Sequence, residues 1–140
     1  LYGTSYIDES MLKPPATLVA PVIQVKKISK GTVGYGRHGE VGPEGKLIAT
    51  IPLGYADGVD RHLSRGAVSF MVNGKPAPTI GNICMDSFMI DVTGNDVKVG
   101  DEVTIFGDAP HPSELARILK TITYEIFTSV SARVERVIVE

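Results

Sequence analysis

Tyrosines next to glycine are the side chains of this sequence best suited to chemistry. Tyr35 lies between two glycines, and Tyr55 follows a glycine in the segment 51–58 (Ile-Pro-Leu-Gly-Tyr-Ala-Asp-Gly). Because the backbone is thin at glycine, each phenol can project toward a neighbouring molecule and exchange a proton with it. Each tyrosine also has a structural interpretation, as an aromatic cap on a sheet edge. A third candidate is the segment 81–86 (Gly-Asn-Ile-Cys-Met-Asp), although a Cys-Met pair commonly fills a core.

Metal binding and hydrolysis have little support in the spacing of the titratable residues. His38, His62 and His111 lie far apart and share no ligand spacing with Cys84. The spacing indicates neither a Ser-His-Asp nor a Cys-His arrangement. We therefore expect no metal site and no hydrolytic centre.

Composition favours one soluble domain. The chain has 140 residues, of which 43% are hydrophobic and 21% charged, which suits a single core. The net charge of -2 disfavours nucleic acid as a partner, and no apolar run approaches the ~20 residues of a membrane span. Cys84 is the only cysteine, so no internal disulfide can form. With no signal peptide visible, we expect a reducing, cytoplasmic location.

The elements that must position the tyrosines are predicted to be short strands. Runs rich in Val, Ile and Thr alternate with turns of Gly and Pro, and Asn73-Gly74 is a strong hairpin signal. Strands are predicted at residues 17–25, interrupted at Pro21, and at 47–53, 67–72, 78–83, 88–92, 102–106 and 133–139.

Helices are predicted near the C-terminus only. Residues 113–119 combine good helix formers with a preceding proline, and a second helix is predicted from residue 123 to about 130. We therefore expect a mainly β fold, an antiparallel or mixed β-barrel-like domain with one or two short helices near the C-terminus.

Six segments, in this order, resemble the C-terminal domain of bacterial alanine racemases. They are residues 33–36, 51–58, 72–78, 81–86, 99–103 and 121–125. The resemblance covers nearly the whole chain as a single domain, 1–140, and residues 1–12 are similar to the linker that follows the family's N-terminal barrel. Two positions depart from the family: Asn82 stands where a basic residue is common, and Glu135 stands where a proline is common.

The resemblance implies a part in the interconversion of L- and D-alanine, with pyridoxal 5'-phosphate as an electron sink. A lysine of the N-terminal PLP-binding barrel, which we expect outside this chain, would bind the cofactor. The parent enzyme would be a homodimer that acts on a small amino acid and supplies D-alanine for peptidoglycan synthesis. The isolated fragment is expected to be inactive.

Tyr35 matches the family's tyrosine base, which reaches the active site of the partner subunit. A phenol in water is a weak base near neutral pH, because its pKa is about 10. A base of this kind needs a cationic neighbour to stabilise the phenolate, and in the family that neighbour comes from the barrel.

The remaining matches concern substrate and cofactor. Met85 matches the residue that binds the substrate carboxylate, mainly through its main chain. Tyr55, Arg61 and Asp86 match residues that line the corridor through which the substrate arrives. Tyr124 matches a residue in the vicinity of the cofactor phosphate, although on a short helix it could instead be a core residue.

Three alternatives stay open. The chain could belong to a racemase of another small amino acid such as serine, since neither the corridor tyrosines nor Asn82 decide the substrate. It could be a non-catalytic dimerisation module, against which the presence of both Tyr35 and Met85 argues. It could be the related β-domain of PLP decarboxylases, but there a cysteine-based acid motif is expected, and Cys84 lies inside the racemase-like segment.

Overall fold

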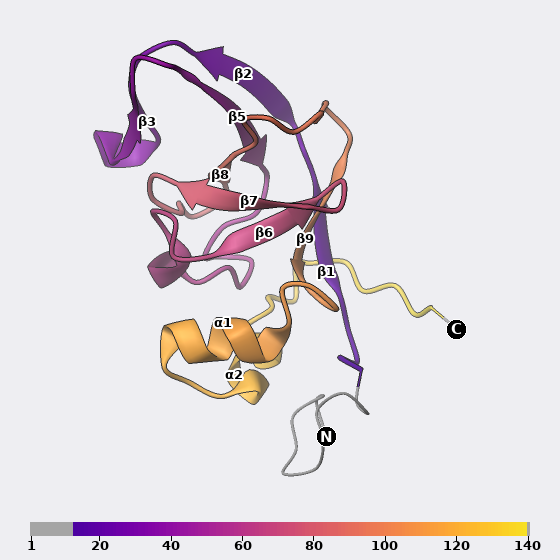
Figure 1. Cartoon of the computed structure of the whole chain (residues 1–140). Helices are drawn as coiled ribbons and strands as arrows, with labels where there is room; N and C mark the ends of the chain where they lie inside the picture. Colours follow the sequence, from indigo (N-terminus) through magenta and orange to yellow (C-terminus); the bar gives the residue numbers. More distant parts are fainter. Residues whose placement is uncertain (1–12, 140) are drawn as a thin grey trace.

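The fold is built on a curved antiparallel sheet. The structure, a computed structural model, describes residues 13–139, so the expected linker at 1–12 lies outside the described residues. In this part of the chain the main sheet has seven strands, in the order β1-β9-β6-β7-β8-β5-β2 (Figure 1). They are β1 (Leu18–Pro21), β2 (Gln24–Ile28), β5 (Lys46–Ile51), β6 (Ser69–Val72), β7 (Lys75–Ile80), β8 (Phe88–Asp91) and β9 (Glu102–Phe106).

The two edges of this sheet meet at the link between β1 and β2. The long first strand of the sequence prediction is divided at Pro21: β1 pairs with β9, whereas β2 pairs with β5. Within the link, the Val22 N–H donates to the Asp101 carbonyl with an N–O distance of 2.8 Å, and the Ile23 N–H donates to the Thr50 carbonyl at 3.0 Å. The sheet thus bends round on itself, and the predicted barrel-like fold is confirmed.

Apolar side chains fill the interior of this curved sheet. Phe70 and Ile90 are fully buried, and the rings of Phe70 and Phe88 pack with centroids 5.2 Å apart. Buried and half-exposed residues alternate along β6 and β8, because successive side chains of a strand point to opposite faces of the sheet. This alternation is the period-2 pattern from which the sequence predicts these strands.

Two short helices lie together at one end of the sheet, as predicted (Figure 1). They are α1 (Pro112–Leu119) and α2 (Thr123–Thr128), so the second helix ends two residues before the predicted position. Phe127 of α2 packs edge to face against Phe106 of β9, with ring centroids 5.5 Å apart, which fixes the helices to the sheet. No helix among residues 13–139 is long and apolar enough to cross a membrane.

The hairpin predicted at Asn73-Gly74 joins β6 to β7. These residues have φ angles of 50° and 73°, the left-handed values that a two-residue hairpin turn requires. A second hairpin, β3 (Gly31–Val33) with β4 (Gly39–Val41), was not predicted.

Strand β7 begins three residues earlier than predicted and contains Pro76 and Pro78. Prolines cannot donate to a neighbouring strand. The Thr79 N–H donates to Val68 on the β6 side, so the nitrogens of both prolines face the other side, because backbone direction alternates along a strand. On that side β8 pairs with β7 only at Thr79 and Ile80, beyond both prolines. The missing N–H groups of Pro76 and Pro78 therefore cost no hydrogen bond to β8.

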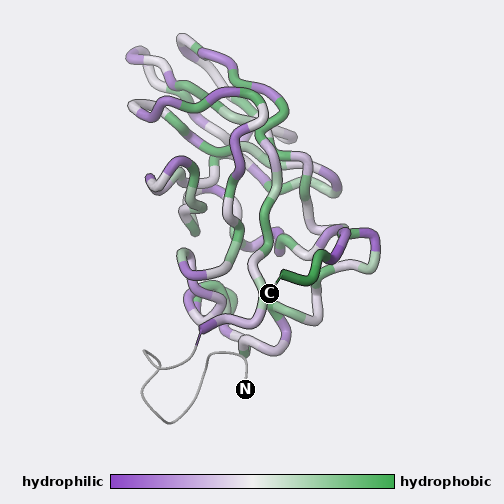
Figure 2. The backbone as a smooth tube through the Cα atoms, turned by 90° about the vertical axis from the view of Figure 1, so that its right-hand side faces the viewer, coloured by the Kyte–Doolittle hydropathy of each residue, from purple (hydrophilic) through white to green (hydrophobic). Residues whose placement is uncertain are grey.

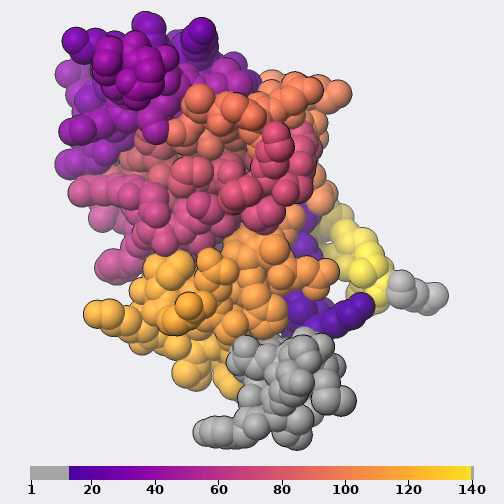
Figure 3. Space-filling model, in the orientation of Figure 1, coloured from indigo at the N-terminus to yellow at the C-terminus, as the bar shows by residue number. Residues whose placement is uncertain are grey.

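The closing strand predicted at 133–139 is wrong. The chain turns instead, with the Val134 N–H donating to the Ser131 carbonyl. Arg136 donates to the carbonyls of Val130, Ser131 and Val134, so its side chain folds back over this turn and occupies the Val134 carbonyl that a strand would offer to a partner. Figure 3 shows this segment leaving the body of the molecule, and Figure 2 shows that its last described residues, all exposed, are strongly hydrophobic.

Candidate active-site surface

One short segment, residues 81–86, holds the candidate site together, and we call it the hub segment. The Tyr35 loop (residues 34–38) joins β3 to β4 and packs against the first part of the hub segment. The Tyr55 loop (residues 52–60) follows β5 and packs against its last part. The three segments that the sequence singles out therefore lie next to one another in space.

Tyr35 projects from its loop into solvent. It begins a single 3-10 turn, Tyr35–Arg37, between Gly34 with φ of 79° and Gly36 with φ of 72°, which are conformations that only glycine adopts without strain. The residue is 79% exposed, and its hydroxyl has no hydrogen-bond partner among residues 13–139. The phenol is therefore presented outward from the described part of the domain.

Asn82 supports the Tyr35 loop from the hub segment. The residue is only 6% exposed. Its Nδ2 donates to the Tyr35 carbonyl at 3.3 Å, while its Oδ1 accepts from Arg65 Nε at 2.8 Å. Because both ends of this buried amide are bonded, its orientation is fixed. The departure at position 82 thus places a neutral amide beneath the tyrosine.

Two backbone hydrogen bonds join the Tyr55 loop to the hub segment. The Tyr55 N–H donates to the Cys84 carbonyl at 3.0 Å, and the Ala56 N–H donates to the Met85 carbonyl at 3.1 Å. This close approach requires glycine at position 54, since a Cβ on Gly54 would lie 2.2 Å from each of these carbonyl oxygens. Met85 is 53% exposed, and its own N–H donates to no acceptor among the described residues.

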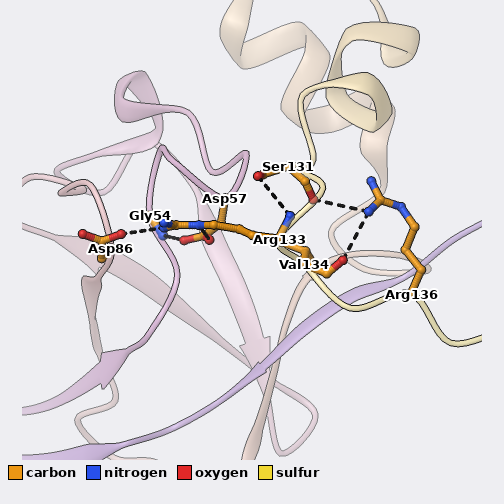
Figure 4. A network of polar contacts seen from close by, with 7 residues as sticks. All are labelled: Gly54, Asp57, Asp86, Ser131, Arg133, Val134 and Arg136. Atoms are coloured by element: carbon orange, nitrogen blue, oxygen red, sulfur yellow. Dashed lines mark hydrogen bonds and ion pairs between the residues drawn. The ribbon is translucent and has the colours of Figure 1, made fainter.

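A guanidinium connects the same two segments through their carboxylates (Figure 4). Arg133 Nε donates to Asp57 Oδ1 at 2.6 Å, and Arg133 Nη2 donates to Asp86 Oδ1 at 2.5 Å. Asp57, which is 5% exposed, also accepts a hydrogen bond from the Gly54 N–H at 2.8 Å. The network therefore joins a buried carboxylate of the Tyr55 loop to an exposed carboxylate of the hub segment.

These contacts favour the charged forms of Asp57 and Arg133. The hydrogen bond from Arg133 lowers the pKa of Asp57, against the opposing effect of burial, and the Gly54 N–H lowers it further. The pKa of Arg133 is raised in return, first by its hydrogen bond to Asp57 and then by that to Asp86. Sequence reasoning identified Asp86 but missed the other two members of the network, because Asp57-Gly58 has the pattern of an ordinary turn and Arg133 is 47 positions from Asp86.

A cavity of about 540 Å³ adjoins the Tyr55 loop. Tyr55 and Arg61 line one side of it, and Glu125 with apolar residues of α1 and α2 lines the other. Tyr124 lies in α2, directly before Glu125 in the sequence. It is 47% exposed, so its interpretation as a buried core residue is not supported. The structure thus brings Tyr55 and Arg61 to one cavity, whereas Tyr35 lies at the far end of the hub segment.

The arrangement offers proton exchange and anion binding at one open surface. Tyr35 presents a hydroxyl, and Met85 presents an unpaired main-chain N–H, which is a donor suited to a carboxylate. Among residues 13–139, no three His, Cys, Asp or Glu side chains are grouped as metal ligands. Both Tyr35 and Met85 are exposed on this surface.

Comparisons with known proteins agree on one family. The model of the alanine racemase C-terminal domain matches residues 16–138. The alanine racemase of Desulforamulus reducens is 46% identical over an alignment of 144 residues, which covers 98% of this chain and 38% of that protein. Alanine racemase 1 of Clostridium acetobutylicum is 42% identical over an alignment of 147 residues, which covers 99% of this chain and 38% of that protein.

Solved structures agree as well. The alanine racemase of Streptomyces coelicolor A3(2) superimposes with a TM-score of 0.86 and 36% identity, covering 97% of this chain and 38% of its own. A complex of the Clostridium difficile 630 alanine racemase with cycloserine gives a TM-score of 0.84 and 32% identity, covering 95% and 37%. The chain therefore spans less than two-fifths of the length of these relatives.

Proposed function

The chain belongs to the alanine racemase family, as its C-terminal domain, and on this premise we propose that it completes an active site held by another domain. The whole enzyme would interconvert L- and D-alanine. The remaining part would be an N-terminal barrel that precedes this single domain, with residues 1–12 as the linker. The D-alanine formed would serve peptidoglycan synthesis in the cytoplasm.

The observation that carries this proposal is the presentation of Tyr35. A structural tyrosine is normally packed or hydrogen-bonded, whereas this one is 79% exposed on a loop whose turn glycines form and whose backbone accepts a hydrogen bond from Asn82. Inversion at the α-carbon requires a proton to leave one face and another to arrive at the opposite face. Tyr35 Oη would exchange the proton on one face, and a lysine of the barrel would serve the other.

Met85 and Asp86 would act on the substrate rather than on the proton. The Met85 N–H, which has no acceptor among the described residues, is suited to donate a charge-assisted hydrogen bond to the substrate carboxylate. A main-chain contact of this kind tolerates the apolar side chain. Tyr55, Arg61 and Asp86 would line the access corridor and favour a small amino acid by narrowing it.

The cofactor would be pyridoxal 5'-phosphate, held chiefly by a lysine outside this chain. When bound, it withdraws electrons from the α-carbon and so acidifies the α-hydrogen. The described residues fit an edge contact with this group: Tyr124 is half-exposed on α2, and its phenol is a hydrogen-bonding group of the kind from which a phosphate accepts. They offer no enclosed site that would hold the cofactor alone.

The whole enzyme would be a homodimer. Tyr35 points away from its own domain, so it would serve the active site of the partner subunit, whose barrel would supply the cation that stabilises the phenolate. The 140-residue chain alone would then be inactive, since it contains neither the second base nor the main cofactor site.

Tyr35→Phe in the full-length enzyme tests the proposal. We expect the rate of D-alanine formation from L-alanine to fall by about 10²–10⁴-fold, the usual contribution of a general base. In deuterated water, the variant should still exchange the α-hydrogen of one alanine enantiomer through the remaining base. Unchanged circular dichroism and cofactor absorbance would show that the variant is folded and loaded.

Three outcomes would contradict parts of the proposal. Full activity of Tyr35→Phe would make Tyr35 a packed aromatic with no role in proton transfer. A wild-type enzyme that racemises L-serine but not L-alanine would assign the site to another small amino acid. A dimeric enzyme that racemises neither would indicate a non-catalytic dimerisation module.

A further inference from the structure

The strongest unexplained feature of the site is the guanidinium that bridges the Tyr55 loop and the hub segment. We infer that Arg133 is a positioning residue, whose bridge between Asp57 and Asp86 sets the orientation of the neighbouring Met85 N–H and thereby the affinity for the substrate carboxylate. The inference rests on the proposed role of Met85 and adds a third element, the C-terminal tail, to the site.

The bridge has one buried and one exposed end. The Asp57 side chain is 8% exposed, whereas that of Asp86 is 65% exposed. Asp57 is also held by the Gly54 N–H at 2.8 Å, so it cannot move independently of its loop. Arg133 therefore ties Asp86, and with it the exposed segment that carries Met85, to the buried carboxylate of Asp57.

The tail that carries Arg133 is itself fixed to the Tyr55 loop. The Ser131 N–H donates to the Asp57 carbonyl at 3.1 Å, only two residues before Arg133. The backbone at Ser129 passes close to Gly58: a Cβ added to Gly58 would lie 2.7 Å from the Ser129 carbonyl oxygen. Because the backbone places Arg133 in advance, the guanidinium is not a freely moving surface ion pair, which would contribute little.

Two donors of one guanidinium make the bridge. Nε and Nη2 lie in one rigid plane, and each reaches a different carboxylate within 2.6 Å. A lysine at this position would retain the positive charge but offers a single ammonium, so it cannot hold both carboxylates in the same geometry. Arg133→Lys therefore keeps the positive charge and removes the bridge, so the two contributions can be measured separately.

The effect should fall on substrate binding and spare proton transfer. Met85 lies at the end of the hub segment that Arg133 holds, whereas Tyr35 is supported at the other end by Asn82. Loss of the bridge should therefore raise KM with little change in kcat. A merely structural role would instead reduce the amount of active enzyme and lower the apparent kcat.

The test compares Arg133→Lys with Arg136→Lys in the full-length holoenzyme. Arg136 is a matched control, since it lies in the same tail and binds only carbonyls of that tail. For Arg133→Lys, we expect KM for L-alanine to rise about tenfold with kcat within about twofold, as for loss of a ground-state contact. Both constants of the control should stay within about twofold of wild type.

Asp86→Asn provides a second variant that keeps an acceptor oxygen but loses the charge. Combined with Arg133→Lys, it should raise KM no further than Arg133→Lys alone, because the two residues act through one contact. A local readout is the methyl NMR signal of Met85, which should shift in Arg133→Lys and remain unchanged in the control.

An unchanged KM together with an unchanged Met85 signal in Arg133→Lys would overturn the inference, as would equal effects of the two lysine variants. If the wild-type enzyme does not racemise alanine, the proposed function fails. The Met85 signal then still decides whether Arg133 positions the hub segment: a shift confined to Arg133→Lys supports the positioning, and no shift overturns it.

Discussion

Replacing Gly54 with alanine should force the Tyr55 loop away from the hub segment. The new Cβ would lie 2.2 Å from the carbonyl oxygens of Cys84 and Met85, whereas ordinary van der Waals contact begins at 3.4 Å. Both oxygens belong to backbone and cannot rotate away. The backbone at Gly54 is not left-handed, so the clash and not conformational strain determines the effect.

The expected cost follows from what must move. Separating the segments weakens the two hydrogen bonds from Tyr55 and Ala56 to the hub segment, each with a net value of about 1 kcal/mol. Residual overlap adds about 1–3 kcal/mol, as for other overpacked sites. The lower entropy of alanine in the unfolded chain offsets about 0.4–1 kcal/mol. The free energy of unfolding should therefore fall by about 2–4 kcal/mol.

Urea unfolding of the 140-residue chain, followed by circular dichroism, measures this difference, provided that the denaturant slope is unchanged. Gly42→Ala is a matched control. Gly42 is also outside the left-handed region, but the three atoms nearest to an added Cβ would all belong to the carboxyl group of the Glu44 side chain, which can rotate away. Its free energy of unfolding should change by less than about 0.5 kcal/mol.

Equal destabilisation by the two substitutions, within about 0.5 kcal/mol, would refute the reasoning, because it would mean that the loop and the hub segment separate at negligible cost. A large loss in Gly54→Ala with an altered denaturant slope would require the comparison to be made by thermal unfolding, with the same expected order of stability.

Three further predictions concern charge and packing. The pKa of Asp57 is lowered in the folded state, first by the Arg133 hydrogen bond. The ionised carboxylate therefore stabilises the fold at pH values above the unfolded-state pKa of about 3.9. This stabilisation is lost as the pH falls through the folded-state pKa. Asp57→Asn should therefore be less stable than wild type at pH 7, with the difference in urea midpoint shrinking toward about pH 2. Asp91→Ala should lower the free energy of unfolding by about 1–3 kcal/mol, because it removes the 2.5 Å pair with Lys46 between β5 and β8; a smaller loss than in Lys46→Met would count against this. Phe127→Leu should lose about 0.5–1.5 kcal/mol in a thermal melt through its edge-to-face ring contact, and an unchanged melting temperature would contradict it.

Strands with strong local signals are predictable from sequence in this chain. The segments 47–53 and 102–106 are rich in β-branched residues between turns, and strands Lys46–Ile51 and Glu102–Phe106 occur there. The β3–β4 hairpin was missed because each strand has three residues, one of them glycine, which leaves too little pattern to detect. The predicted closing strand failed because two tail arginines form contacts that hydrophobic alternation does not indicate.

The candidate site is predictable in its segments but not in its connections. Glycine next to tyrosine marks the Tyr35 and Tyr55 loops, and both do lie against the hub segment. The pairing of Arg133 with Asp57 spans 76 positions, so only the folded chain brings them together. The catalytic and substrate-binding roles of these residues stay predictions that the kinetic experiments test.

The link at Val22 and Ile23 also has a consequence for the order of events during folding. It sends β1 to a partner, β9, that is more than eighty positions later in the chain, whereas most neighbouring strands pair across shorter separations. Contacts at such separation form slowly, because a long loop must close first. On the ribosome, the apolar residues Leu18 and Ala20 emerge before the rest of the main sheet, and their partner strand is absent until Phe106 has been synthesised. The first strand of this sheet to be synthesised is thus paired late, and a nascent chain stalled before β9 would expose an unpaired edge open to aggregation.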